Sequence, residues 1–113
     1  MLKIYHNPRC RKSRETLQLI KDQGEAVEVV EYLNEVPSVE TLRTVLEKLG
    51  LKPLDIVRKG EAIFKDHFKG KNFDDEGWLK ILYENPKLIE RPIVVKGNKA
   101  IIGRPPDHVK QLF

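Results

Sequence analysis

The first 32 residues of the chain follow the order strand, helix, strand, and this order leaves few possible folds. Apolar patterning predicts strands at residues 2–5 and 27–32, with a helix at residues 13–23 between them. Gly24 is a typical helix stop. Strand, helix and strand in succession favour parallel pairing of the two strands with a right-handed crossover. The chain is therefore predicted to start as a βαβ unit.

The middle of the chain is predicted to be helical. Ser38 is a suitable N-cap for an amphipathic helix that ends at Gly50, and a second amphipathic helix follows Asp74. Residues 65–72, which lie between these helices, are polar and predict a loop. We therefore expect a helical insertion at about residues 37–90.

The last third of the chain changes character. Residues 93–95 and 100–102 are rich in Val and Ile and flank Gly97-Asn98, which predicts a β-hairpin. Residues 105–113 predict a closing helix with a proline near its first turn. The predicted order is βαβ, helical insertion, ββα, within a single domain of residues 1–113.

Cys10 is the only cysteine, and it lies at the turn between the first strand and the first helix. A sulfur at a helix N-terminus faces unpaired backbone N–H groups and the positive end of the helix dipole. Arg9, Arg11 and Lys12 add positive charge. In such settings a cysteine pKa falls from about 8.5 into a range of roughly 3.5–7.5. A small buried apolar residue is the alternative role for a free cysteine, but three flanking cations favour a reactive thiolate.

A thiol at the first strand-to-helix turn of such a sheet is the thioredoxin-like arrangement. The second mark of that arrangement is a cis-proline that begins the third strand and faces the thiol, and Pro92 is the candidate. We therefore predict an α/β fold, a thioredoxin-like mixed β-sheet flanked by helices. The helical insertion separates the N-terminal βαβ unit from the C-terminal ββα unit.

Bulk composition places the chain among ordinary globular proteins and excludes several functions. No apolar run approaches the ~20 residues that span a bilayer, and we expect no signal peptide before the first strand. One cysteine cannot form an internal disulfide, which fits the reducing cytoplasm. A net charge of +4, from 21 basic and 17 acidic residues, suits a small anionic substrate, and no dense basic block indicates nucleic-acid binding. We expect neither a bound metal nor a bound cofactor.

Three arginines, Arg58, Arg91 and Arg104, lie at junctions between predicted elements. The planar guanidinium offers paired N–H donors that suit tetrahedral oxyanions. Each arginine alone is most simply a solvated surface charge. Together they predict a converging oxyanion site.

Two polar residues near Cys10 are candidates for tuning its thiol. Ser13 lies one turn along the helix, from where its hydroxyl can donate to the thiolate; capping of the helix terminus is the alternative. His6 either tunes Cys10 or merely ends the first strand.

Three segments give the chain a resemblance to a known family: residues 5–14 (Tyr-His-Asn-Pro-Arg-Cys-x-x-Ser-Arg), residues 90–95 and residues 103–105. It resembles the glutaredoxin-coupled arsenate reductases and the wider group of small thioredoxin-fold proteins that includes the Spx-type regulators. The resemblance covers nearly the whole chain.

The resemblance implies a mechanism. The Cys10 thiolate attacks the arsenic of arsenate, which is held by the arginines that match Arg58, Arg91 and Arg104. Glutathione, as co-substrate, attacks the intermediate, arsenite leaves, and glutaredoxin resolves the resulting mixed disulfide. The residues agree on one point: a chain with a single cysteine needs an external thiol to complete the cycle.

Two other functions stay open. An Spx-like regulator would dock on an RNA polymerase subunit, but such regulators commonly switch through Cys-x-x-Cys, and here Ser13 stands where the second cysteine would be. A glutathione-dependent thiol oxidoreductase with another substrate would use the same Cys10. The convergent arginines favour an oxyanion over an organic substrate.

Overall fold

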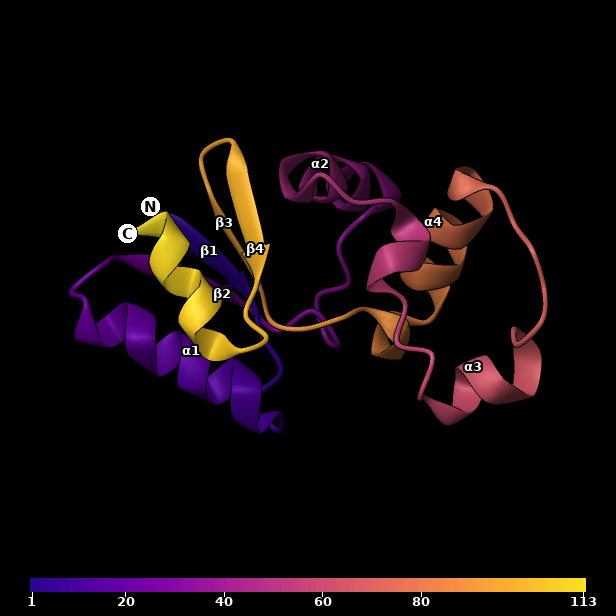
Figure 1. Cartoon of the computed structure of the whole chain (residues 1–113), viewed down its shortest axis with the longest axis horizontal. Coiled ribbons are helices and arrows are strands. Elements are labelled where there is room, and N and C mark those ends of the chain that lie inside the picture. Colours follow the sequence, from indigo (N-terminus) through magenta and orange to yellow (C-terminus); the bar gives the residue numbers. More distant parts are fainter. The chain divides into compact units, whose positions relative to one another are not determined.

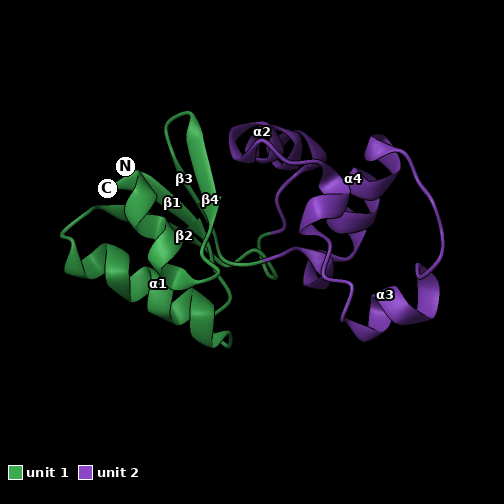
Figure 2. Ribbon diagram, viewed as in Figure 1, with its two compact units in different colours: residues 1–35, 91–113 green, residues 36–90 purple.

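The computed structural model describes all residues from Met1 to Phe113. Two compact units make up the chain: unit 1 comprises residues 1–35 and 91–113, and unit 2 comprises residues 36–90 (Figure 2). Unit 1 holds the β-sheet, whereas unit 2 is helical. No helix is long and apolar enough to cross a membrane.

Unit 1 is built on a four-stranded mixed sheet with the strand order β2-β1-β3-β4 (Figure 1). β1 pairs in parallel with β2 and antiparallel with β3, which in turn pairs antiparallel with β4. The predicted βαβ unit, hairpin and thioredoxin-like sheet are therefore confirmed. β2 ends two residues before the predicted boundary. The strands are β1 (Leu2–Tyr5), β2 (Val27–Val30), β3 (Ile93–Lys96) and β4 (Lys99–Ile102).

One face of this sheet is covered by α1 (Arg11–Asp22) and by η3 (Pro106–Leu112), a 3-10 helix. Successive strand residues point to opposite faces, so Leu2 and Ile4 of β1 share a face with Val94, which is paired with Ile4. These three side chains are fully buried. The core of unit 1 consists of Leu2, Ile4, Ile20, Val94, Val109 and Leu112.

Both helical segments of unit 1 differ in detail from the prediction. α1 begins at Arg11, two residues before the predicted start, because Cys10 occupies the N-cap position. The closing segment is a 3-10 helix with a proline in its first turn. Val109 and Leu112, on its inward face, are buried as predicted.

Unit 2 contains the predicted helical insertion. Ser38 caps α2, since its Oγ accepts a hydrogen bond from the Thr41 N–H at 3.1 Å, and Gly50 ends the helix with a φ of 70°. Asp74 caps α4 in the same way through the Gly77 N–H at 2.8 Å. The elements of unit 2 are α2 (Val39–Leu49), η1 (Pro53–Ile56), α3 (Ala62–His67), α4 (Asp75–Glu84) and η2 (Pro86–Leu88).

The prediction of a loop at residues 65–72 is wrong at residues 65–67, because α3 spans Ala62–His67. The local sequence is polar, but Phe64 is buried and its ring stacks on Trp78 at a centroid distance of 6.3 Å. This tertiary contact stabilises a short helix that the local pattern does not indicate.

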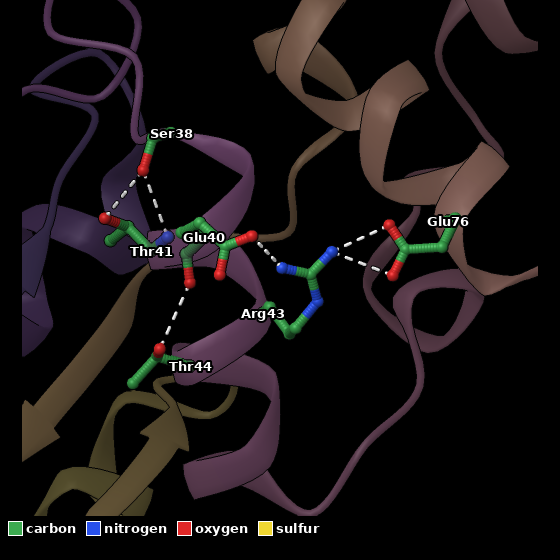
Figure 3. A network of polar contacts seen from close by, with 6 residues as sticks. All are labelled: Ser38, Glu40, Thr41, Arg43, Thr44 and Glu76. Atoms are coloured by element: carbon green, nitrogen blue, oxygen red, sulfur yellow. Dashed lines mark hydrogen bonds and ion pairs between the residues drawn. The ribbon is translucent and has the colours of Figure 1, made fainter.

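A polar network joins α2 to α4 within unit 2 (Figure 3). Arg43 of α2 pairs with Glu40 on its own helix and donates to both carboxylate oxygens of Glu76 on α4, at 2.8 and 2.7 Å. Hydrogen bonds to Glu76 and Glu40 raise the pKa of Arg43. The network is solvent-exposed, so we assign it an orienting role and little stabilisation.

Candidate active site

Cys10 is held by a tight turn between β1 and α1. The Asn7 carbonyl accepts a hydrogen bond from the Cys10 N–H at 3.0 Å, and the Asn7 side-chain oxygen accepts from the Arg9 N–H at 3.0 Å. Asn7 thus fixes the turn through both its main chain and its side chain. Cys10 itself is the N-cap residue of α1, with extended backbone angles, and it is partly exposed.

The guanidinium of Arg104 lies beside the thiol. Its Nη1 lies 4.0 Å from the Cys10 Sγ. Arg9 and Lys12, beside Cys10 in the sequence, are exposed, and Arg11 forms an ion pair with Glu15 on the next turn. The field at the sulfur therefore combines the helix N-terminus with the Arg104 guanidinium, and both favour the thiolate.

The segments that carry Arg91 and Arg104 meet beside the thiol. The Arg104 Nη1 donates to the Arg91 carbonyl at 3.3 Å, and the Gly103 N–H donates to the Pro92 carbonyl at 2.9 Å. The Arg91–Pro92 peptide bond is cis. The Arg104–Pro105 bond is also cis, which the sequence analysis did not predict. Unit 1 thus brings together the sole thiol, Arg104 and the Arg91–Pro92 segment.

His6 and Ser13 form a buried pair at the end of β1. The His6 Nδ1 and the Ser13 Oγ lie 2.6 Å apart, and the Ser13 Oγ also accepts the Asn7 N–H at 3.1 Å. Ser13 is fully buried in the first turn of α1, and Cys10, not Ser13, occupies the N-cap position. Its hydroxyl is paired with His6 and Asn7, and no hydrogen bond joins it directly to Cys10.

The protonation state of His6 decides what the Ser13 hydroxyl can do. Burial lowers the pKa of His6; Glu31 opposes this shift, and Lys21 and Arg14 add to it. When Nδ1 is unprotonated, it accepts the Ser13 hydroxyl proton. When Nδ1 carries a proton, it donates to Ser13, and the hydroxyl proton becomes available to another acceptor.

Arg58 belongs to unit 2, and carboxylates hold its guanidinium there. Its Nη1 lies 3.1 Å from Glu61, and its Nε lies 3.7 Å from Glu90. The Arg58 N–H donates to the Leu88 carbonyl at 2.7 Å, so the main chain is also fixed. Arg58 thus belongs to a different unit from Cys10, Arg91 and Arg104.

Thr16 and its contact with Gly103 were not predicted from the sequence. Thr16 of α1 donates to the Lys12 carbonyl at 2.8 Å, and its hydroxyl lies 3.5 Å from the Gly103 carbonyl. The Gly-Arg-Pro motif at residues 103–105 was the only sequence feature that pointed to Gly103. The contact between Thr16 and Gly103 joins residues 87 positions apart, so no local pattern indicates it. No group of three or more His, Cys, Asp or Glu side chains is placed to hold a metal ion.

The chain is similar to several known proteins over its full length. It is 44% identical to the uncharacterized protein YfgD of Escherichia coli K12, covering 98% of this chain and 95% of YfgD. It is 38% identical to an arsenate reductase of Neisseria meningitidis, covering 99% and 97% of the two chains. The solved structure of an arsenate reductase from Vibrio cholerae superimposes with a TM-score of 0.95 at 43% identity, covering 99% of this chain and 97% of that one.

The ArsC family model matches residues 5–112, which include the turn around Cys10, the Arg91–Pro92 segment and Arg104. The matched region therefore contains every element that builds the site of unit 1. This protein is a member of the ArsC family.

Proposed function

We propose that this protein reduces arsenate to arsenite, with Cys10 as the nucleophile and with glutathione and glutaredoxin as electron donors. One observation carries the proposal: the only thiol lies at a helix N-terminus, 4.0 Å from the guanidinium of Arg104 and beside the Arg91–Pro92 segment. Relatives named arsenate reductase, at about 40% identity over the full length, support it.

The first step is binding of the anion. Arg104 supplies N–H donors beside the thiol. Arg91 directly precedes Pro92, and its carbonyl accepts a hydrogen bond from the Arg104 guanidinium. Both guanidinium groups offset the negative charge of the oxyanion, which would otherwise repel an approaching thiolate. Arg58 is the third expected ligand; this role rests on the family resemblance, because Arg58 is paired with Glu61 and Glu90 within unit 2.

The second step is covalent. The Cys10 thiolate attacks arsenic(V), and one arsenate oxygen takes up protons from the solvent and leaves as water. The thiolate of glutathione then attacks the Cys10 sulfur, the sulfur–arsenic bond breaks, and its electron pair stays on arsenic. Arsenic(III) leaves as arsenite, and a Cys10–glutathione disulfide remains. The two thiols have each lost one electron, which balances the two-electron reduction of arsenic.

The third step restores the thiol. The chain holds no second cysteine, so the disulfide at Cys10 is reduced by an external dithiol or thiol. Glutaredoxin is the proposed partner because it acts on glutathione mixed disulfides. No bound cofactor takes part in this scheme.

His6 and Ser13 are proposed to tune the thiol as a pair. When His6 donates its Nδ1 proton to Ser13, the Ser13 hydroxyl is released to donate toward the Cys10 sulfur from one turn along α1. With the proton on Nδ1, both His6 and the Asn7 N–H donate to the Ser13 oxygen, which leaves the hydroxyl proton for another acceptor.

A coupled assay tests the proposal. The purified protein is mixed with arsenate, glutathione and glutaredoxin, and NADPH oxidation is followed through glutathione reductase. Wild-type protein should sustain turnover that depends on arsenate and on glutathione, whereas Cys10→Ser should have none. Arg43→Ala, which removes an arginine of unit 2 from its ion-pair network, should keep wild-type turnover. A reactive Cys10 without arsenate-dependent turnover would contradict the proposal and favour a thiol oxidoreductase with another substrate.

A further inference from the structure

We propose that Gly103 is a positioning residue, which sets Arg104 over the Cys10 thiol because it lacks a side chain. The residue lies between the end of β4 and Arg104. Its N–H donates to the Pro92 carbonyl at 2.9 Å, so it ties the segment of Arg104 to the segment of Arg91. The inference uses the proposed function for one of its readouts only.

The space around Gly103 admits no Cβ atom. A Cβ built there would lie 2.5 Å from the Thr16 Oγ1, 2.8 Å from the Pro92 Cγ and 3.0 Å from the Thr16 Cγ2. Carbon atoms at van der Waals contact stay about 3.5–4.0 Å apart. Alanine at this position therefore requires a shift. Either Thr16 and Pro92 move away from residue 103, or the backbone at the end of β4 moves away from α1.

Neither neighbour yields easily. Thr16 is fully buried, β-branched, and held by its hydrogen bond to the Lys12 carbonyl at 2.8 Å. Pro92 is a rigid ring that is buried at the start of β3. The easier response is movement of the backbone at residues 103–104, and this movement lengthens the 4.0 Å separation between the Arg104 Nη1 and the Cys10 Sγ.

Gly103 is needed for space and not for its backbone conformation. Its φ lies outside the left-handed region, in contrast to Gly97 with a φ of 58°. Gly97 lies in the turn at the opposite end of the same hairpin, and a Cβ there would meet nothing within 4 Å. The two glycines thus separate a steric role beside the thiol from a purely conformational role in a turn, which makes Gly97→Ala the matched control.

The test compares Gly103→Ala with Gly97→Ala in the full chain. Three readouts apply: the rate of Cys10 alkylation by iodoacetamide at pH 7, the protection of Cys10 by inorganic phosphate, and the arsenate kcat/KM. Gly103→Ala should slow alkylation and weaken phosphate protection. It should also lower kcat/KM by about ten- to a hundred-fold, as expected for a displacement approaching 1 Å. Gly97→Ala should lower the midpoint of thermal unfolding and leave all three readouts at wild-type values.

A compensating variant identifies the cause. Thr16→Ala removes both Thr16 atoms that a Cβ at Gly103 would meet. The double variant Thr16→Ala/Gly103→Ala should therefore recover part of the loss seen in Gly103→Ala, because the contact with the Pro92 Cγ at 2.8 Å remains. If Gly103→Ala does not fold, as judged by circular dichroism, Thr16→Val places a methyl group at the same contact from α1 and should slow alkylation in the same way.

Wild-type alkylation and kinetics in folded Gly103→Ala would overturn the inference. A folded double variant that recovers nothing would contradict the steric role assigned to Thr16. Failure of the proposed function is a separate result: wild-type protein would show no arsenate turnover, while alkylation of Cys10 would still report whether Gly103 positions Arg104.

Discussion

Cys10 combines three features that stabilise a thiolate: the N-cap position of α1, partial exposure, and the Arg104 guanidinium 4.0 Å away. Iodoacetamide at pH 7 should therefore alkylate Cys10 faster than it alkylates glutathione under the same conditions. Arg104→Ala should slow this reaction, because it removes the guanidinium that lies 4.0 Å from the sulfur. Alkylation of wild-type Cys10 that is no faster than alkylation of glutathione would contradict the thiolate assignment.

Arg104 should also matter for the anion. Loss of one charge-assisted hydrogen bond costs about 1.5–3 kcal/mol, so Arg104→Ala should lower the arsenate kcat/KM by about ten- to a hundred-fold. Arg104→Lys should rescue only part of this loss, because a point charge does not reproduce the guanidinium fork. Arg91→Ala should lower kcat/KM to a similar degree. Wild-type arsenate kinetics in these folded variants would make both residues surface charges, as a regulator that binds RNA polymerase would require.

His6 gives the stability of the protein a pH dependence. Burial lowers the pKa of His6 in the folded state below its ordinary value of 6.5. Below pH 6.5, His6 is protonated in the unfolded chain but stays neutral in the folded chain until the pH reaches its lower folded-state pKa. The free energy of unfolding therefore falls as the pH drops from 6.5 toward that pKa. Urea unfolding from pH 8 down to about 5 should show this loss. His6→Gln should flatten this part of the curve, and an unchanged slope would contradict the assignment.

At the scale of elements, the caps of unit 2 are the most direct sequence-encoded feature. Ser38→Ala removes the hydrogen bond that satisfies the Thr41 N–H at the start of α2. It should lower the free energy of unfolding by about 1 kcal/mol, measured by urea unfolding. Ser38→Asp, which keeps an acceptor at the N-cap, should retain wild-type stability. Equal stability of the alanine and aspartate variants would show that this cap does not contribute.

The elements that the sequence predicts well are those with a strong local pattern. The Val- and Ile-rich runs on both sides of Gly97-Asn98 indicate the hairpin of β3 and β4, and Ser38 and Gly50 mark the two ends of α2. α3 was missed because its stability comes from Phe64 packing on Trp78, which lies in another helix. The closing segment was predicted as a helix, but its 3-10 geometry over residues 106–112 has no clear sequence signal.

At the scale of the whole molecule, the site depends on topology. Cys10 and Arg104 are separated by 94 positions, and the sheet order β2-β1-β3-β4 brings them together. Local patterns predicted the turn around Cys10. The junctions between predicted elements indicated the three arginines, and the family resemblance implied their role in holding arsenate. The pairing of Ser13 with His6, the contact of Thr16 with Gly103 and the ion pairs of Arg58 could not be predicted, because each depends on side-chain positions that the fold sets.

The most direct test of the central claim is the intact mass of the protein after one reaction cycle. Wild-type protein is incubated with arsenate and glutathione, without glutaredoxin, and is compared with Cys10→Ser. The account predicts one glutathione per chain, attached through a disulfide to Cys10, formed only when arsenate is present and removed by added glutaredoxin. An unmodified Cys10 that nevertheless supports arsenite formation, or efficient turnover with thioredoxin in the absence of glutathione, would contradict it.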